Sequence, residues 1–121
     1  MADVSRLDWL TLPAKTGLEK CCLPAVSVQS NPDTWENVQL VVHAMEGGNA
    51  QVTGTTVGSL IPQGPGISSV ATFTDISIRR AGNYIIEVRS VLRPDISIIA
   101  PRPIVIGKED VTIRSIPIVL L

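Results

Sequence analysis

Residues 70–90 read VATFTDISIRRAGNYIIEVRS and indicate the fold more clearly than any other part of the chain. The first run, Val70–Ile78, is rich in Val, Thr, Phe and Ile, which pack well on a pleated sheet. After a polar corner at Arg79–Asn83, the second run, Tyr84–Ser90, alternates between an apolar face and a mixed face. Because successive side chains of a strand point to opposite faces of a sheet, both runs are predicted to be strands.

Strand patterns of the same kind recur along the chain at intervals of roughly 8–12 residues. Val38–Met45 is the clearest of them, because every second residue from Val38 to Ala44 is apolar. Turn signals rich in Gly, Pro, Asn and Asp separate the runs, and no segment keeps the period of a helix. We therefore expect an all-β, antiparallel fold, with further strands at Ala25–Val28, Ala50–Thr55, Val57–Ile61, Ile96–Ile99 and Ile104–Ile106.

The composition agrees with a β fold and argues against several functional classes. Val and Ile contribute 14 residues each and Thr nine of the 121, and such β-branched side chains disfavour helices. With 45% apolar and 17% charged residues, the chain is too apolar for a disordered protein. No apolar run reaches the roughly 18–20 residues of a membrane-spanning helix, so no membrane insertion is expected. The net charge of −1 gives no electrostatic reason to expect a nucleic-acid partner.

The two runs within residues 70–90 resemble a phrase of the immunoglobulin-like repeats in bacterial surface proteins and of filamin-like domains. Asn49–Thr56 is similar to the strand and corner that precede this phrase in such repeats, and Ile104–Ile106 is similar to their final strand. The resemblance covers residues 24–107. It implies an immunoglobulin-like, antiparallel Greek-key β-sandwich of about seven to nine strands, and it favours an extracellular or surface-associated location.

Gly82 and Tyr84 form a predicted structural corner within this phrase. A glycine two residues before a tyrosine that opens an alternating strand is typical of the tyrosine corner of Greek-key sandwiches, in which the hydroxyl bonds a nearby backbone group. Many relatives carry Asp two residues before the glycine, where this chain has Arg80. The sequence lacks the Cys…Trp…Cys pattern of antibody domains, so an antibody-type domain is not expected.

The resemblance leaves both ends of the chain unexplained and suggests a division into three parts. These are an N-terminal arm at residues 1–22, the sandwich at residues 23–107 and an additional C-terminal β-strand within residues 108–121. In the arm, Leu7–Leu12 is compatible with a short strand or a helical turn. The arm carries several charged residues and no continuous apolar stretch, so no signal peptide is expected.

Val111–Leu121 is a feature that a standard repeat of this kind does not need. It has one charge in eleven residues and strong β-propensity, so an uncovered strand here would be prone to aggregate. It either adds a strand to its own sandwich, for example beside Leu7–Leu12, or pairs with another subunit by strand addition. Pro117 cannot donate a ladder hydrogen bond and is expected at an edge or a bulge. The candidate interaction residues are Val111, Ile113, Ile116, Ile118, Val119 and Leu121.

The sequence offers few residues for catalysis or zinc binding. His43 is the only histidine, and a catalytic role would need it beside a cysteine or a carboxylate. The only cysteines, Cys21 and Cys22, are adjacent, which disfavours a disulfide between them, and we expect them to be reduced and partly buried. These three residues are too few for a zinc site with four ligands. We therefore expect no catalytic residue and no cofactor.

The remaining charged residues are best interpreted as solvated. A loop-end calcium site is the weaker alternative for the acidic turn residues, which include Asp33, Asp75 and Asp95. The only basic cluster combines Arg79–Arg80 with Arg89 and Arg93. Because no aromatic residues flank this cluster, it is interpreted as a solvated corner and not as a nucleic-acid platform.

The repeat-like phrase and the lack of catalytic groups favour a non-enzymatic structural or adhesive module. Such a module would mediate protein–protein interaction or spacing within a surface or scaffold assembly, although this fold hosts many unrelated tasks. The apolar terminal strand favours an alternative, a self-assembling subunit of a fibre, filament or coat. Both hypotheses predict a protein partner or self-association, but only the second predicts ordered polymers.

Overall fold

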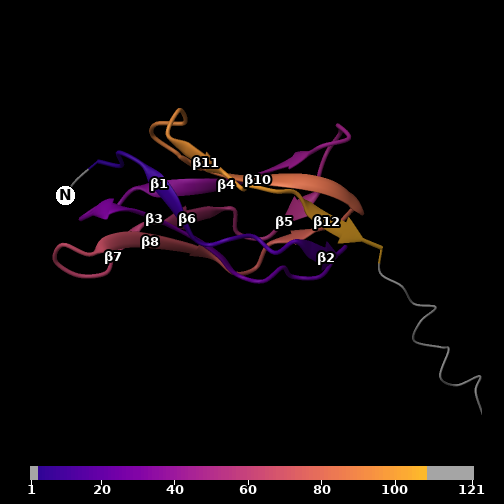
Figure 1. The fold of residues 1–121 in the computed structure, drawn as a ribbon, viewed down its shortest axis with the longest axis horizontal. Coiled ribbons are helices and arrows are strands. Elements are labelled where there is room, and N and C mark those ends of the chain that lie inside the picture. The colour runs from indigo at the N-terminus through magenta and orange to yellow at the C-terminus, as the bar shows by residue number, and fades with distance from the viewer. Residues whose placement is uncertain (1–2, 109–121) are drawn as a thin grey trace, which may run out of the picture.

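A computed structural model describes residues 3–108, which form twelve short β-strands and no helix. Ten of the strands build two sheets that pack face to face in an elongated sandwich, and the other two form a short ladder of their own (Figure 1). The N-terminal residues of the described chain lie at one end of the long axis, and the chain leaves the last strand at the opposite end (Figure 1). The predicted all-β, antiparallel sandwich is therefore confirmed.

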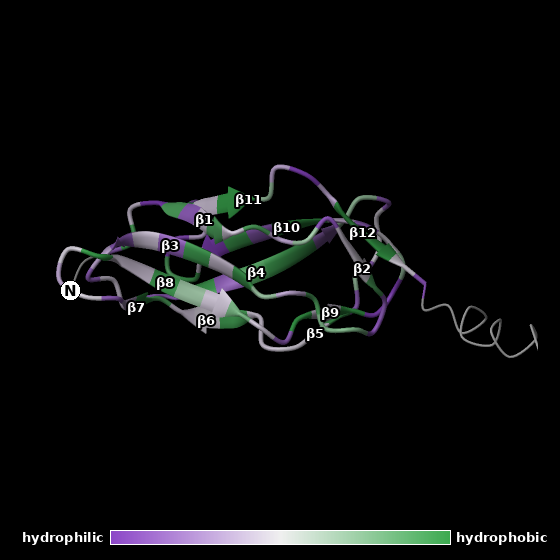
Figure 2. Ribbon diagram, turned by 60° about the horizontal axis from the view of Figure 1, so that its bottom comes forward, coloured by the Kyte–Doolittle hydropathy of each residue, from purple (hydrophilic) through white to green (hydrophobic). Residues whose placement is uncertain are grey.

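The first sheet, which we name the β3 sheet, is antiparallel throughout. Its spatial order is β1 (Leu7–Thr11), β3 (Val26–Pro32), β8 (Ser68–Phe73) and β7 (Ile61–Pro62). Buried and more accessible positions alternate along β8, and hydrophobic and hydrophilic residues alternate along the first half of β3 (Figure 2). This alternation buries one face of the sheet and leaves the other in solvent.

The second sheet, which we name the β10 sheet, is built around the long central strand β10 (Gly82–Ser90). Its spatial order is β2 (Thr16–Leu18), β12 (Ile104–Gly107), β10, β4 (Asn37–Ala44) and β6 (Val57–Ser59). The strand β11 (Ser97–Ile99) pairs with the C-terminal half of β10. It lies on the same side of β10 as β12, which pairs with the N-terminal end of that strand. Only β2 and β12 run parallel. A separate ladder joins β5 (Val52–Thr53) to β9 (Ser77–Ile78).

The strand order is that of an immunoglobulin-type Greek key, in which the last strands pair with a central strand of one sheet and the first strand begins in the other. The N-terminal segment contributes to both sheets, because β1 pairs with β3 and β2 pairs with β12. The predicted N-terminal arm, residues 1–22, thus contains β1 and β2, one strand of each sheet.

The hydrophobic core lies between the inner faces of the two sheets. From β4, the alternate residues Val38 and Leu40 point inward, and from β10 the buried residues Tyr84, Ile86 and Val88 do the same, as the sequence pattern predicts. The β3 sheet supplies matching residues, and the loops add others. The largest completely buried apolar side chains are Leu60, Ile78, Ile104, Ile106, Val28, Val38 and Val88.

Three local expectations differ from the structure. The predicted strand Val57–Ile61 is wrong as a single element, because β6 ends at Ser59 and pairs with β4, whereas β7 begins at Ile61 and pairs with β8 of the other sheet. The predicted strand Val70–Ile78 is wrong as a single element, because β8 ends at Phe73 and β9 begins at Ser77. Between them, the Asp75 carboxylate accepts hydrogen bonds from the backbone and hydroxyl of Thr55, both at 2.9 Å, which turns the chain toward the β5–β9 ladder. The two cysteines, expected to be partly buried, are both exposed.

Candidate functional site

The outer face of the β10 sheet carries several aliphatic side chains among its polar ones. Its central strands present Val41 and Ile85, both partly buried, and neighbouring strands add Val57, Val105 and Ile99. These last three side chains are 44%, 48% and 58% exposed. Scattered exposed aliphatic residues are normal on proteins, but several on one sheet face are typical of interaction surfaces.

A hydrogen-bonded group of charged residues lies in the middle of this aliphatic face, and we name it the Glu87 group. Glu87, on β10, accepts hydrogen bonds through one carboxylate oxygen from His43 Nε2 and from Arg89 Nη2, each at 2.7 Å. The side chain of Glu87 is only 11% exposed, whereas those of His43 and Arg89 are 48% and 34% exposed. The carboxylate is therefore covered by its partners, which present nitrogen atoms to solvent.

The register of the sheet explains why these residues meet. Ile85 lies opposite His43 and Glu87 opposite Val41, so His43 and Glu87 are diagonal neighbours across the β4–β10 pair. Diagonal positions on one face lie within reach of long side chains. Glu87 also lies opposite Ile99 of β11, so aliphatic residues on both neighbouring strands cover it.

The environment of Glu87 has opposing effects on its pKa. Burial raises the pKa, because it disfavours the charged carboxylate. Hydrogen bonds from His43, Arg89 and Ser97, with the positive charge of Arg89, lower it and outweigh the burial, so the pKa of Glu87 lies below its ordinary value. Glu87 is accordingly ionised near neutral pH and holds its two partners in place.

His43 has a carboxylate neighbour but lacks the other parts of a nucleophilic site. A Ser-His-acid or Cys-His arrangement needs a hydroxyl or thiol within hydrogen-bond reach of the histidine. Within residues 3–108, the hydrogen bonds of His43 include no Ser, Thr or Cys partner, and both cysteines are exposed between β2 and β3. In the described part of the chain, the hydrogen-bond partner of the His43 ring is the Glu87 carboxylate.

The predicted corner residues Gly82 and Tyr84 lie at the start of β10. The Tyr84 ring is buried, and its hydroxyl donates a 2.7 Å hydrogen bond to the carbonyl of Arg80. A Cβ atom at Gly82 would approach the Tyr84 hydroxyl oxygen to 3.3 Å, so a larger residue here would press on the ring. The corner is a structural element, which fixes the entry of the chain into the central strand.

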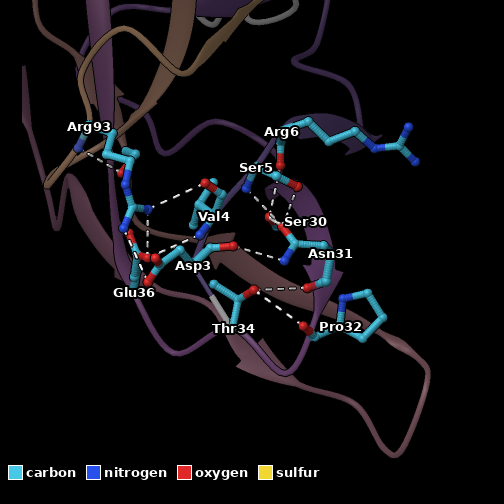
Figure 3. A network of polar contacts seen from close by, with 11 residues as sticks. Asp3, Val4, Ser5, Arg6, Ser30, Asn31, Pro32, Thr34, Glu36 and Arg93 are labelled. Carbon is cyan, nitrogen blue, oxygen red and sulfur yellow. Dashed lines mark hydrogen bonds and ion pairs between the residues drawn. The ribbon is translucent and has the colours of Figure 1, made fainter. Parts of the chain in front are cut away.

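A second polar cluster fastens the N-terminal end, and we name it the Glu36 network (Figure 3). One oxygen of Glu36 accepts hydrogen bonds from the backbone of Val4 at 3.0 Å and from Arg93 at 2.9 Å. Arg93 also pairs with Asp3 at 3.1 Å, and both of its ionic partners raise its pKa further. Beside them, Asn31 donates to the carbonyl of Asp3 at 2.9 Å (Figure 3). The network joins the N-terminal segment, the β3–β4 turn and the β10–β11 loop.

The other sequence-predicted charged residues are not gathered into a site. Arg79–Arg80 precede β10, whereas Arg89 lies near its other end and Arg93 lies beyond it, so the expected basic cluster is dispersed. No group of three or more His, Cys, Asp or Glu side chains that could hold a metal ion occurs in residues 3–108. That part of the chain also contains no helix that is long and apolar enough to cross a membrane.

The predicted C-terminal interaction strand lies outside the described residues, and so do all six of its candidate residues. Sequence reasoning also missed the Glu87 group. It left His43 without a carboxylate partner and did not single out Glu87. The alternating patterns place His43 and Glu87 on the outward faces of their strands. Only the pairing register of these strands shows that the two residues are neighbours.

Comparison with known proteins adds no family to this description. No family model matches the chain, and a search of curated proteins found no match to it.

Proposed function

We propose that the protein is a non-catalytic, immunoglobulin-like interaction module that binds a protein partner through the outer face of the β10 sheet. The observation that supports this most directly is the Glu87 group within an aliphatic surface. Arginine is enriched among the few residues that carry most of the binding energy of an interface, and the near-neutral contacts around such residues exclude water from them.

The charge of the face indicates what the partner presents. The Glu87 carboxylate is covered and already paired, so the polar groups that remain accessible are those of Arg89 and His43. A guanidinium has five N–H donors. Arg89 uses one of its Nη2 donors on Glu87, and its Nε is buried, so the remaining Nη donors are those that a partner can reach. The complementary partner is a protein surface that places a carboxylate against Arg89 and apolar side chains around it.

Site-specific photocrosslinking in the cells that produce the protein tests this proposal. A photoreactive residue in place of Ile85 should give discrete protein adducts, and one in place of Thr72, an exposed residue on the β3 sheet, should not. Arg89→Gln should reduce the adduct yield at least tenfold, whereas Arg6→Gln, at a more exposed arginine paired with Asp8, should leave it unchanged. Equal yields at positions 85 and 72, or none at 85, would contradict the proposal. A structural or spacing role without this docking face would then be favoured.

A further inference from the structure

The outer face of the β3 sheet holds a polar cleft that takes no part in the protein-binding face proposed above. The N-terminal segment, the strands β1 and β3 and the first residue of β8 line this cleft. Its volume of about 340 Å³ lies within the range of small-molecule sites. The cleft is therefore large enough for a small ligand.

A β-bulge gives the cleft a fixed wall. The pairing of β3 with β8 shifts between Ser30 and Pro32, so Asn31 is an extra residue, and bulges of this kind re-aim side chains. The Asn31 side-chain oxygen accepts hydrogen bonds from the backbone and hydroxyl of Ser5, at 3.0 and 3.2 Å, and from the Ser30 hydroxyl at 2.9 Å (Figure 3). A wall held in this way loses little entropy when a ligand binds.

Next to this wall, Asp8 and Gln29 present polar groups that the fold does not use. They lie directly opposite each other across the β1–β3 pair, on the outer face of the sheet, so their Cβ atoms are about 5 Å apart. The Asp8 side chain is 47% exposed, and Arg6 contacts one of its oxygens at 3.2 Å. Within residues 3–108, the other Asp8 oxygen, the Gln29 amide and the Ser68 hydroxyl have no hydrogen-bond partner. These groups are free to bind a ligand.

The charge and polarity of the lining indicate the class of ligand. The carboxylate of Asp8 and the guanidinium of Arg6 pair with each other, so the cleft has no net charge and favours an uncharged ligand. A site for an apolar or aromatic ligand is lined mainly by hydrophobic and aromatic side chains. Among the described residues that line this cleft, Pro32 is the only apolar one. The ligand is therefore an uncharged polar molecule.

The position of the cleft disfavours a peptide strand as this ligand. Strand addition needs a sheet edge with free backbone groups, whereas the cleft lies on a sheet face, over a strand that pairs with β1 on one side and β8 on the other. A molecule rich in hydroxyl groups matches the lining better. Each hydroxyl both donates and accepts hydrogen bonds, a carboxylate accepts them, and a glutamine amide does both.

We propose that this cleft binds a neutral carbohydrate. The free oxygen of Asp8 accepts a hydrogen bond from one sugar hydroxyl, and the Gln29 amide bonds to a neighbouring hydroxyl of the same sugar. Ser68 contacts the ligand from β8, while the fixed side chain of Asn31 bounds the site. This site lies on the opposite sheet from the protein-binding face, so either proposal can fail without the other.

Binding of the full chain to a glycan array tests the class of ligand. The array carries neutral glycans beside sialylated and sulfated ones. We expect binding to a subset of neutral glycans that share a sugar unit, because the cleft has no net charge to offset that of an anionic glycan. A chain that binds no neutral glycan, or that binds anionic glycans more strongly, would overturn the proposal.

NMR titration with the neutral glycan that binds best on the array tests the position of the site. In the isotope-labelled chain, saturable shifts should centre on the backbone amides of residues 5–8, 29–31 and 68. Asp8→Asn should weaken binding at least about tenfold, because a charged acceptor is lost, and Gln29→Ala should weaken it about fivefold.

The matched controls for these variants are Asp95→Asn and Gln63→Ala, at exposed positions outside the cleft. Both should bind the glycan as the unmodified chain does, and thermal unfolding checks that all four variants are folded. Shifts centred on another part of the molecule would place the site elsewhere and overturn the proposal. An affinity that Asp8→Asn or Gln29→Ala leaves unchanged, or that the controls reduce equally, would do the same.

Discussion

Two covered glutamates, Glu36 and Glu87, each hold an arginine, but they connect different parts of the molecule. Glu36 links the backbone of Val4 to Arg93, residues separated by most of the chain. Glu87 links His43 on β4 to Arg89 on β10. These two strands are already joined by the seven residue pairs of their ladder. The Glu36 network therefore closes the fold, whereas the Glu87 group adds little to connections that the sheet makes without it.

This difference indicates why the Glu87 group is the better functional candidate. A carboxylate that neighbouring side chains cover loses part of its hydration, which destabilises the charged form. Hydrogen bonds and ion pairs with its partners must offset this loss. In the Glu36 network, the compensation includes anchoring the N-terminal segment. In the Glu87 group, the main result is that an arginine and a histidine are held in fixed positions on a surface, which lowers the entropy lost when a partner binds.

The largest effect on stability is expected from Glu36→Ala. The Glu36 side chain is only 9% exposed, and its removal leaves the Val4 N–H and Arg93 without their shared acceptor. We expect a loss of about 1–3 kcal/mol in the free energy of unfolding, because buried donors lose their partner. Chemical denaturation measures this loss, and hydrogen exchange should become faster in β1.

The matched control for Glu36→Ala is Glu46→Ala. Glu46 is exposed and accepts hydrogen bonds from the backbone and the side chain of Asn83. Exposed substitutions of this kind usually change stability by no more than about 0.5 kcal/mol. If the two variants lost equal stability, the Glu36 network would not close the fold as described.

A smaller effect on stability is expected from Glu87→Gln. The amide keeps the size of the side chain and one acceptor oxygen, but it removes the negative charge that His43 and Arg89 share. We expect the free energy of unfolding to fall by about 1 kcal/mol, because His43 and Arg89 keep a hydrogen-bond acceptor but lose its negative charge. Denaturation of this variant and of Glu36→Ala under the same conditions gives the order of the two effects. A larger loss for Glu87→Gln would reverse the comparison.

The sequence was sufficient to predict the sheets but not the charged groups on them. Alternation in Val38–Met45 and Tyr84–Ser90 marks buried faces, because the hydrophobic effect acts on each residue separately. The Glu87 group depends on which residue of β4 lies opposite which residue of β10, and a shift of one residue would remove it. The break between Phe73 and Ser77 likewise depends on a distant partner, Thr55.

The smallest expected effect is the pH dependence that Glu87 contributes. Its pKa in the folded protein lies below its ordinary value, which is about 4.3 in an unfolded chain. A carboxyl group whose pKa is lowered by folding stabilises the protein above the unfolded value, and this contribution is lost as the pH falls through the folded value. The difference in unfolding free energy between the unmodified chain and Glu87→Gln should therefore decrease as the pH falls below about 4. Urea denaturation at a series of pH values below about 5 measures this difference, and a difference that grew in this range would show that the hydrogen bonds of His43 and Arg89 do not favour the ionised form of Glu87.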